Sequence, residues 1–427
     1  MTRVTHRYLL TPATLAVLAL AACSGDSPVS SSTGTSSTSS SSASSSGTSS
    51  STSPSSASSP SSSTTSSATS STSSTPVVSS CVSRTVAAMT PTQHAGRLLM
   101  VALTPQMGTN GLDVQLADGL GSMLYLGGWT GRANVAATSE HLQDSAVRVG
   151  GTRVGVLVAA DQEGGEVQQL TGEGFSTIPS GREQGALAPA ELTRQAKGWG
   201  AELEQAGVNV NLAPTTDTVP SEIGRGNAPI GQYGREYGST PAAVTRGATA
   251  FAKGMHAAGV MPTTKHFPGI GRITGNTDAT ASGITDSTAT TSDPHLAPFA
   301  AAMRATPTLV MVGSARYPKI DADNQAPFSR AVVTDLLREQ MGFDGVVVTD
   351  DVGVAKAVAD VPVGQRATRF IAAGGDVVLT ADATQTQTMT SAIVRRAASD
   401  EDFAEQVQAS VTRVLTLKED MGLLRCG

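Results

Sequence analysis

The stretch GFDGVVVTDDVG at residues 342–353 decides the fold class. Its apolar run Val346–Val348 shows no polar alternation, as expected of a strand that is buried on both faces of a parallel sheet. The run ends in Thr349 and two consecutive aspartates, Asp350 and Asp351. Charged residues directly after a buried strand are typical of the catalytic end of an α/β barrel.

Similar apolar runs recur along the chain with helical patterns between them. We expect eight strands, at 97–104, 121–127, 153–160, 207–213, 259–264, 307–313, 344–349 and 375–380. We expect helices at 189–206, 240–257, 293–304, 328–341, 364–373 and 385–397, with a final helix at 401–420. This alternation predicts an α/β fold with a single (β/α)₈ barrel of the TIM type, somewhat irregular in its early units.

Polar segments follow three of the predicted strands. DQEGG at 161–165 follows the third strand, KHFPG at 265–269 follows the fifth, and Asp350-Asp351 follows the seventh. In a barrel of parallel strands, the carboxyl ends of all strands meet at one face. We therefore expect the three segments to line one cavity.

The first 80 residues have a different character. Positively charged residues precede an apolar run at 9–22, which is too short for a stable membrane span and is flanked like a signal peptide. The run ends in LAAC at 20–23, which resembles a bacterial lipobox, so that cleavage before Cys23 and lipidation of its thiol are implied. The alternative is an ordinary signal peptide with an incidental cysteine.

Three segments follow from this interpretation: a lipoprotein signal peptide at 1–22, a disordered tether at 23–80 and a barrel domain at 81–427. Ser and Thr dominate the tether, which cannot form a packed core. We expect a monomer on the extracytoplasmic side of a bacterial cell membrane, attached through a lipid anchor. In an oxidising compartment the two other cysteines, Cys81 and Cys426, are expected to pair and close the fold.

Composition excludes some classes of function. The 427 residues include 29 basic and 35 acidic ones, a net charge of −6, without a cluster of Lys and Arg in the folded part, which disfavours nucleic-acid binding. No HExxH motif or paired CxxC spacing is present, so we expect no metal site. No phosphate-binding glycine loop follows the first predicted strand, so we expect no dinucleotide cofactor.

Six motifs together resemble glycoside hydrolase family 3. They are DQEGGEVQQL at 161–170, NVNLAPTTD at 209–217, GREYGSTP at 234–241, KHFPG at 265–269, Tyr317-Pro318, and GFDGVVVTDDVG at 342–353. Their order is similar to that of the bacterial β-N-acetylglucosaminidases that trim peptidoglycan, and the resemblance spans about 85–420. It implies a retaining, exo-acting β-glycosidase for terminal β-N-acetylglucosaminides or related cell-wall saccharides.

The resemblance also implies roles for single residues. Asp350 would be the nucleophile that forms a glycosyl-enzyme intermediate, with Asp351 as a supporting hydrogen-bond acceptor. The sugar would be contacted by Asp161, Arg235, Lys265 and His266. Two alternatives stay open: His266 is a packed core histidine, and Glu163 either contacts the sugar or braces its own loop.

The loop after KHFPG departs from the family pattern. Where the family has an Asp-Ser-His triplet, whose histidine is the acid/base, this chain has Asn276-Thr277-Asp278. A carboxylic acid can donate the same proton, so Asp278 is the candidate acid/base. The alternative is a solvated loop carboxylate.

Other departures lie nearby. Ile270 and Ser314 stand where the family has histidines, and Glu166 and Gln169 where it commonly has arginines. Arg272 could restore one of the lost positive charges, and Trp129 could stack on a sugar, although packing in the core is the favoured interpretation. Because the leaving-group chemistry is altered, a weak or inactive saccharide-binding lipoprotein and a glycoside phosphorylase remain alternative functions.

Overall fold

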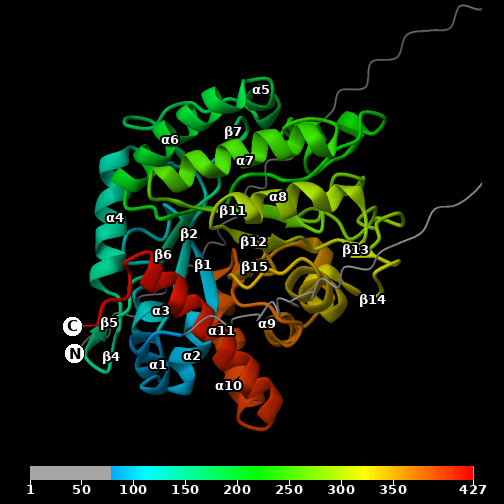
Figure 1. Ribbon diagram of the computed structural model, residues 1–427. Coiled ribbons are helices and arrows are strands. Elements are labelled where there is room, and N and C mark those ends of the chain that lie inside the picture. Colours follow the sequence, from blue (N-terminus) through cyan, green and yellow to red (C-terminus); the bar gives the residue numbers. More distant parts are fainter. Residues whose placement is uncertain (1–77, 427) are drawn as a thin grey trace, which may run out of the picture. The chain divides into compact units, whose positions relative to one another are not determined.

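The computed structural model describes residues 78–426, and its core is an eight-stranded parallel sheet (Figure 1). A bridge between Val348 and Val377 links the first strand of the sheet to the last, so the barrel is nearly closed. The spatial order is β15 (Val347–Thr349), β12 (Leu309–Val312), β11 (Met261–Phe267), β10 (Val210–Asn211), β6 (Leu157–Ala160), β2 (Ser122–Tyr125), β1 (Leu99–Leu103) and β16 (Val378–Thr380).

The eight strands confirm the predicted barrel, and every one lies in or overlaps a predicted run. Their side chains are buried throughout, which explains why the runs show no polar alternation. The prediction was wrong at the end of the fifth strand. β11 continues to Phe267, so Lys265 and His266 lie within the strand, next to a shift in register between Thr264 and Phe267. A bulge of this kind re-aims side chains beside a site.

Helices cover the outside of the barrel, as predicted (Figure 1). They are α6 (Pro189–Gln205), α7 (Pro241–Ala257), α8 (Ala297–Ala305), α9 (Val363–Ala372), α10 (Thr386–Ala397) and α11 (Glu401–Asp420). The Thr240 side chain caps α7 by accepting from Ala243 N, with Pro241 in the first turn. The segment predicted as a helix at 328–341 instead forms a wider π-helix, η5 (Ala331–Gln340).

The early units are less regular, also as predicted. Helices α1 (Ser80–Ala87) and α2 (Pro91–Arg97) precede β1, only the short α3 (Asp113–Ala117) lies between β1 and β2, and α4 (Arg132–Asp144) follows β2. Short paired strands interrupt the early loops: β3 (Trp129–Thr130) with β9 (Leu170–Thr171), β4 (Arg148–Val149) with β5 (Thr152–Arg153), and β7 (Gln162–Gly164) with β8 (Val167–Gln168). Other short elements are α5 (Gly181–Gly185), β13 (Arg316–Tyr317) and β14 (Asp321–Gln325).

The last helix, α11, crosses the amino-terminal end of the barrel. Its Ser410 hydroxyl donates to the carbonyl of Gly375 at 2.9 Å, just before β16. Farther along, the ammonium group of Lys418 donates to the carbonyls of Gly121 and Gly155, each at 2.7 Å. These carbonyls precede β2 and β6, so α11 connects strand ends that lie far apart in the sequence.

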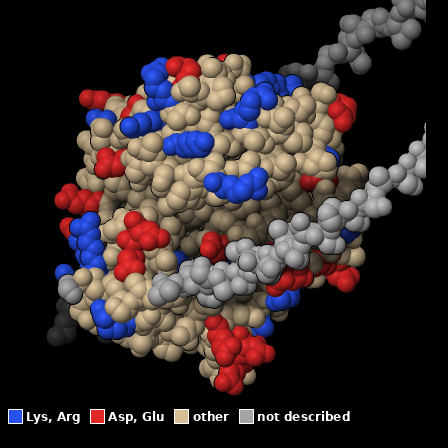
Figure 2. Space-filling view, viewed as in Figure 1, with Lys and Arg blue, Asp and Glu red and all other residues tan. Residues whose placement is uncertain are grey.

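Cys81 and Cys426 form a disulfide, with Cα atoms 5.8 Å apart. Cys23, the segment 1–22 and the tether up to residue 77 lie outside the described residues. Within 78–426, none of the helices has the length and apolar character needed to span a membrane. Lys and Arg side chains are spread over the face seen in Figure 2, with uncharged surface between them.

Candidate active site

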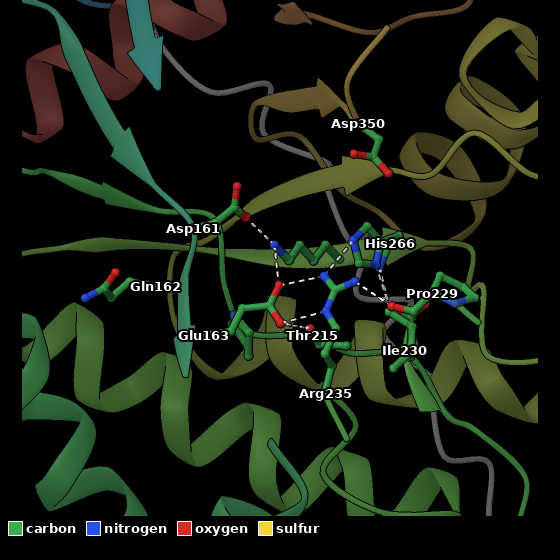
Figure 3. Close-up of polar contacts among 12 residues, drawn as sticks. Asp161, Gln162, Glu163, Thr215, Pro229, Ile230, Arg235, His266 and Asp350 are labelled. Carbon is green, nitrogen blue, oxygen red and sulfur yellow. Dashed lines mark hydrogen bonds and ion pairs between the residues drawn. The ribbon is translucent and has the colours of Figure 1, made fainter. Parts of the chain in front are cut away.

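A cluster of charged side chains lies at the carboxyl ends of β6, β10 and β11 (Figure 3). Glu163 is its centre: Arg235 donates to its two oxygens from Nε at 2.9 Å and from Nη2 at 2.7 Å. Lys265 Nζ lies 2.6 Å from Glu163 and 2.5 Å from Asp161 Oδ1, and the Thr215 hydroxyl donates to Glu163 at 3.0 Å. The structure thus brings together residues that are up to 104 positions apart.

In this buried cluster, each charged group shifts the pKa values of its neighbours. Burial alone would raise the pKa of Glu163, but the Arg235 and Lys265 cations outweigh it and hold that pKa well below the ordinary value. Likewise, burial would lower the pKa of Lys265, and the Asp161 and Glu163 carboxylates raise it instead. Glu163, Arg235 and Lys265 are therefore ionised at neutral pH. Both Glu163 oxygens are engaged and its side chain is 6% exposed, so Glu163 braces the cations. This role differs from both predicted alternatives, because its partners are side chains of other segments and not the backbone of its own loop.

Asp161 keeps contact with solvent. One of its oxygens accepts from Lys265, and its side chain is 20% exposed. The backbone turn that follows it relies on Gly164 and Gly165, which have φ angles of 109° and 58°. A Cβ atom on Gly164 would lie 2.2 Å from the carbonyl oxygen of Pro179. Both this clash and the positive φ angle exclude a side chain at Gly164.

His266 is held by a carboxylate that the sequence did not single out. Its Nδ1 lies 2.8 Å from Oδ2 of Asp217, which is fully buried and also accepts from the backbone N–H of His266 and of Ile270. Nε2 faces Arg235 Nη2 at 3.5 Å. A guanidinium only donates, so this contact is a hydrogen bond only where Nε2 is the acceptor. His266 is 4% exposed, so it is both well packed and part of the charged cluster.

Asp350 follows β15 and lies across from His266 in Figure 3. Its backbone N–H donates to the carbonyl of Val312 at 2.9 Å, which fixes the residue to the end of β12. The side chain is only partly buried. Burial raises the pKa of Asp350, while the charge of His266 and the N–H of Asp351, which donates to Oδ1 at 2.8 Å, oppose that rise.

Asp351 has a different environment from its neighbour. Its carboxylate accepts four backbone N–H groups, from Gly353 (2.9 Å), Val354 (2.8 Å), Ala355 (3.0 Å) and Ala381 (2.7 Å). It therefore closes the turn after β15 and ties that turn to the end of β16. This geometry agrees with the predicted supporting role.

Asp278 lies on the loop after β11, and its backbone is fastened to the turn after Asp351. Lys356 N donates to the Asp278 carbonyl at 3.1 Å, and Ala357 N donates to the Thr277 carbonyl at 3.0 Å. Solvent reaches the Asp278 side chain. Surrounding protein atoms nevertheless desolvate the carboxyl, which together with the Asp350 charge raises the pKa of Asp278 to about 6. Asn276 accepts from Asp278 N at 3.0 Å and so shapes the loop backbone.

Arg272, Gln169 and Trp129 have structural roles. Arg272 is bound to Asp286 at 2.7 Å and to Asp293 at 2.6 Å, so its charge is neutralised and does not replace a lost cation. Gln169 accepts from Gly127 N at 3.0 Å and shapes the loop after β2. Trp129 is 3% exposed and donates to the Leu103 carbonyl at 3.1 Å, which makes it a core residue.

Across 78–426, no group of three or more His, Cys, Asp and Glu side chains is arranged to hold a metal ion. The site is instead built from one partly exposed aspartate, a second carboxyl with a raised pKa, and a fixed array of donors and acceptors. Such an array suits the hydroxyl groups of a sugar, and the two carboxyls suit nucleophilic and acid/base roles.

Comparisons with known proteins agree with this geometry. The family model for the glycosyl hydrolase family 3 N-terminal domain matches residues 96–417. A β-hexosaminidase of Xylella fastidiosa is 35% identical over 243 residues, which cover 55% of this chain and 68% of that protein. The crystal structure of a β-N-acetylhexosaminidase from Beutenbergia cavernae is 42% identical with a TM-score of 0.72, covering 78% of this chain and 99% of the other.

A family 3 β-N-acetylglucosaminidase from Paenibacillus gives 29% identity and a TM-score of 0.68, covering 79% of this chain and 63% of the other. The family match covers the whole barrel, including every residue of the charged cluster and both candidate carboxyls. The chain therefore belongs to glycosyl hydrolase family 3 and is a glycoside hydrolase.

Proposed function

We propose that the protein is a retaining, exo-acting β-glycosidase that removes terminal β-N-acetylglucosamine or a related sugar from cell-wall saccharides. The observation that carries the proposal is the Asp350 carboxylate, partly exposed at a strand end and facing a buried array of sugar-binding groups. The names of the similar proteins, β-hexosaminidase and β-N-acetylhexosaminidase, support this choice of sugar.

In the first step, an Asp350 oxygen bonds to the anomeric carbon while the bond from that carbon to the leaving oxygen breaks. Asp278 gives its proton to the leaving oxygen. In the second step, the Asp278 carboxylate takes a proton from water. The water oxygen bonds to the anomeric carbon as the ester bond to Asp350 breaks, which regenerates both carboxyls.

The remaining residues would bind and orient the sugar. Asp161 offers an acceptor, while Lys265 and Arg235 offer charged donors whose positions Glu163 fixes. His266, held by Asp217, presents its Nε2 edge to the same space. Fixed groups of this kind lose little entropy on binding, so they hold the anomeric carbon near the nucleophile.

A panel of aryl β-glycosides, tested on the full chain and on Asp350→Ala, examines the proposal. We expect turnover of N-acetylglucosaminides by the wild type and its loss in Asp350→Ala. A slow 2-fluoro glycoside should label Asp350, as peptide mass mapping would show. Absence of turnover on every sugar, with saccharide binding still measurable by calorimetry, would instead establish a binding protein, an alternative suggested by the altered Asn276–Asp278 loop. Product that forms only with added phosphate would establish a phosphorylase.

We also propose that Cys23 carries a lipid that anchors the protein to the outer face of a bacterial cell membrane, with 24–80 as the tether. The support is the LAAC sequence at 20–23 after the apolar run. Intact mass measurement on protein from the membrane fraction tests this. A mass without lipid, or a Cys23→Ser protein that stays in the membrane fraction, would contradict it.

A further inference from the structure

A second group of buried charges lies at the opposite end of the barrel from the active site. Arg97, the last residue of α2, is completely buried. Its Nη1 donates to the carbonyl of Leu120 at 3.3 Å, just before β2. Its Nε and Nη2 are buried too, and within 78–426 neither nitrogen has a hydrogen-bond partner.

Lys418 of α11 places its amino group at the same end of the barrel. It is also completely buried, and it donates to the carbonyl of Gly121, the residue after the one that holds Arg97. Burial, and to a lesser extent the nearby Arg97 charge, lowers the pKa of Lys418 well below its ordinary value. The hydroxyl of Ser122, next in the chain, is buried without a partner among the described residues. Three buried donor groups at this place therefore lack an acceptor among the described residues: Nε and Nη2 of Arg97 and the hydroxyl of Ser122.

The free edge of Arg97 has a specific geometry. The N–H groups of Nε and Nη2 point the same way, forming the fork that grips anions. In the active site, Arg235 uses this edge to hold Glu163. Nearer to Arg97, Arg338 and Arg413 share the buried Asp376, at 2.7 Å and 2.8 Å. Arg97 and Lys418 form no ion pair with any acidic side chain in the described part of the chain.

The lack of an acidic partner among the described residues matters because it leaves the charge of Arg97 without a counter-charge. Burial lowers the pKa of Arg97 to about 10, so the guanidinium is still charged at neutral pH. A buried charge without a counter-charge is strongly unfavourable, and so is a buried donor without an acceptor. One bound anion would satisfy both conditions at once.

We propose that Arg97 and Lys418 form a binding site for one small inorganic monoanion of the halide class, such as chloride, at the amino-terminal end of the barrel. The anion accepts from Nε and Nη2 of Arg97 and balances the charge of that guanidinium. Because Arg97, Lys418 and Ser122 are all fully buried, a monatomic ion suits the site better than a large oxyanion. The ion stabilises the contact between α11 and the starts of β2 and β6.

Thermal unfolding of the full chain in sodium chloride and in sodium gluconate, at matched ionic strength, tests the site. Chloride should raise Tm above the gluconate value by about 2 °C for each tenfold increase in its concentration once the site begins to fill. Arg97→Gln should abolish that difference. Arg338→Gln is the control: it removes a guanidinium that is 14% exposed at the same end of the barrel, lowers Tm, and should retain the full chloride effect.

Crystals of the wild type soaked in sodium bromide provide a measurement that does not depend on the variants folding. An anomalous peak within hydrogen-bond distance of Arg97 Nε and Nη2 would establish the ion. Equal Tm in the two salts, or a position that holds water and gives no anomalous signal, would overturn the proposal. A chloride effect that survives in Arg97→Gln would overturn it as well, since the responsible site would lie elsewhere.

Discussion

Replacing Asp278 with asparagine keeps the shape of the side chain and removes its proton. If Asp278 is the acid that protonates the leaving oxygen, the loss should depend on the leaving group. Substrates with poor leaving groups, such as disaccharides, need the proton, whereas activated aryl glycosides leave as stable anions. Asp278→Asn should therefore affect the two classes of substrate very differently.

The structure sets the size and the pH range of the effect. With a pKa of about 6, Asp278 is half protonated at pH 6, about a hundredfold more than an aspartate of ordinary pKa 3.8 would be. A general acid contributes about 10²–10⁴ in rate, so kcat/KM for a disaccharide should fall by that factor. For a nitrophenyl glycoside we expect a loss of less than about tenfold.

The sign of the pH dependence follows from the two carboxyls. Asp278 acts in its protonated form, so activity on poor leaving groups is present below pH 6 and is lost as the pH rises through that value. Asp350 acts ionised, and its own raised pKa limits activity at the acid side. The wild type should thus give a bell-shaped profile on disaccharides, whose apparent values belong to the pair. Asp278→Asn should lose the alkaline limb.

Steady-state kinetics on one disaccharide and one nitrophenyl glycoside, from pH 4 to 8, measures both effects. Asp402→Asn is the control for the charge change, since Asp402 is exposed at the start of α11, away from the site. Equal losses on both substrates, or an unchanged alkaline limb in Asp278→Asn, would refute the assignment of Asp278 as the acid.

Three further predictions concern the supports of the site. Asp351→Ala removes the acceptor of four backbone N–H groups, so we expect a loss of about 2–4 kcal/mol in the free energy of unfolding by urea and lower kcat; wild-type turnover would contradict the bracing role. Glu163→Gln leaves Lys265 and Arg235 without their shared carboxylate, which should cost about 3–5 kcal/mol. Because the pKa of Glu163 is held below its ordinary 4.5, that difference in urea stability should stay constant from pH 7 to about 5 and shrink only at lower pH; a difference that shrinks above pH 5 would contradict this. Changing Cys81 and Cys426 together to serine should lower unfolding stability by up to about 5 kcal/mol, because the disulfide closes a loop of 345 positions; unchanged stability in denaturant would argue against a closed bond.

The barrel could be predicted because its strands are buried on both faces. Such strands give continuous apolar runs, and eight of them separated by helical patterns leave few other folds. The extent of β11 could not be predicted, because Lys265 and His266 look like loop residues by polarity. They remain in the strand because carboxylates from the segments after β6 and β10 bind them, namely Asp161, Glu163 and Asp217. Those partners are distant in the sequence.

In the candidate site, too, partners that are distant in the sequence could not be predicted. Strand-end motifs pointed to Asp161, Lys265, His266 and Asp350, and the structure brings these residues together. Asp217 was missed as a partner of His266, although it ends the quoted motif at 209–217, because a lone aspartate after Thr-Thr has no distinctive pattern. The pairing of Arg272 with two aspartates was also missed, since the contact depends on how the loop folds back.

The disulfide between Cys81 and Cys426 has a consequence for how the protein can be cut. It makes the stretch between the two cysteines a covalent ring. A protease that cleaves one exposed loop within the ring opens it but releases no fragment, because both pieces stay joined through sulfur. The nicked protein would migrate as a single species until a reductant is added, and its barrel strands would still be held as neighbours.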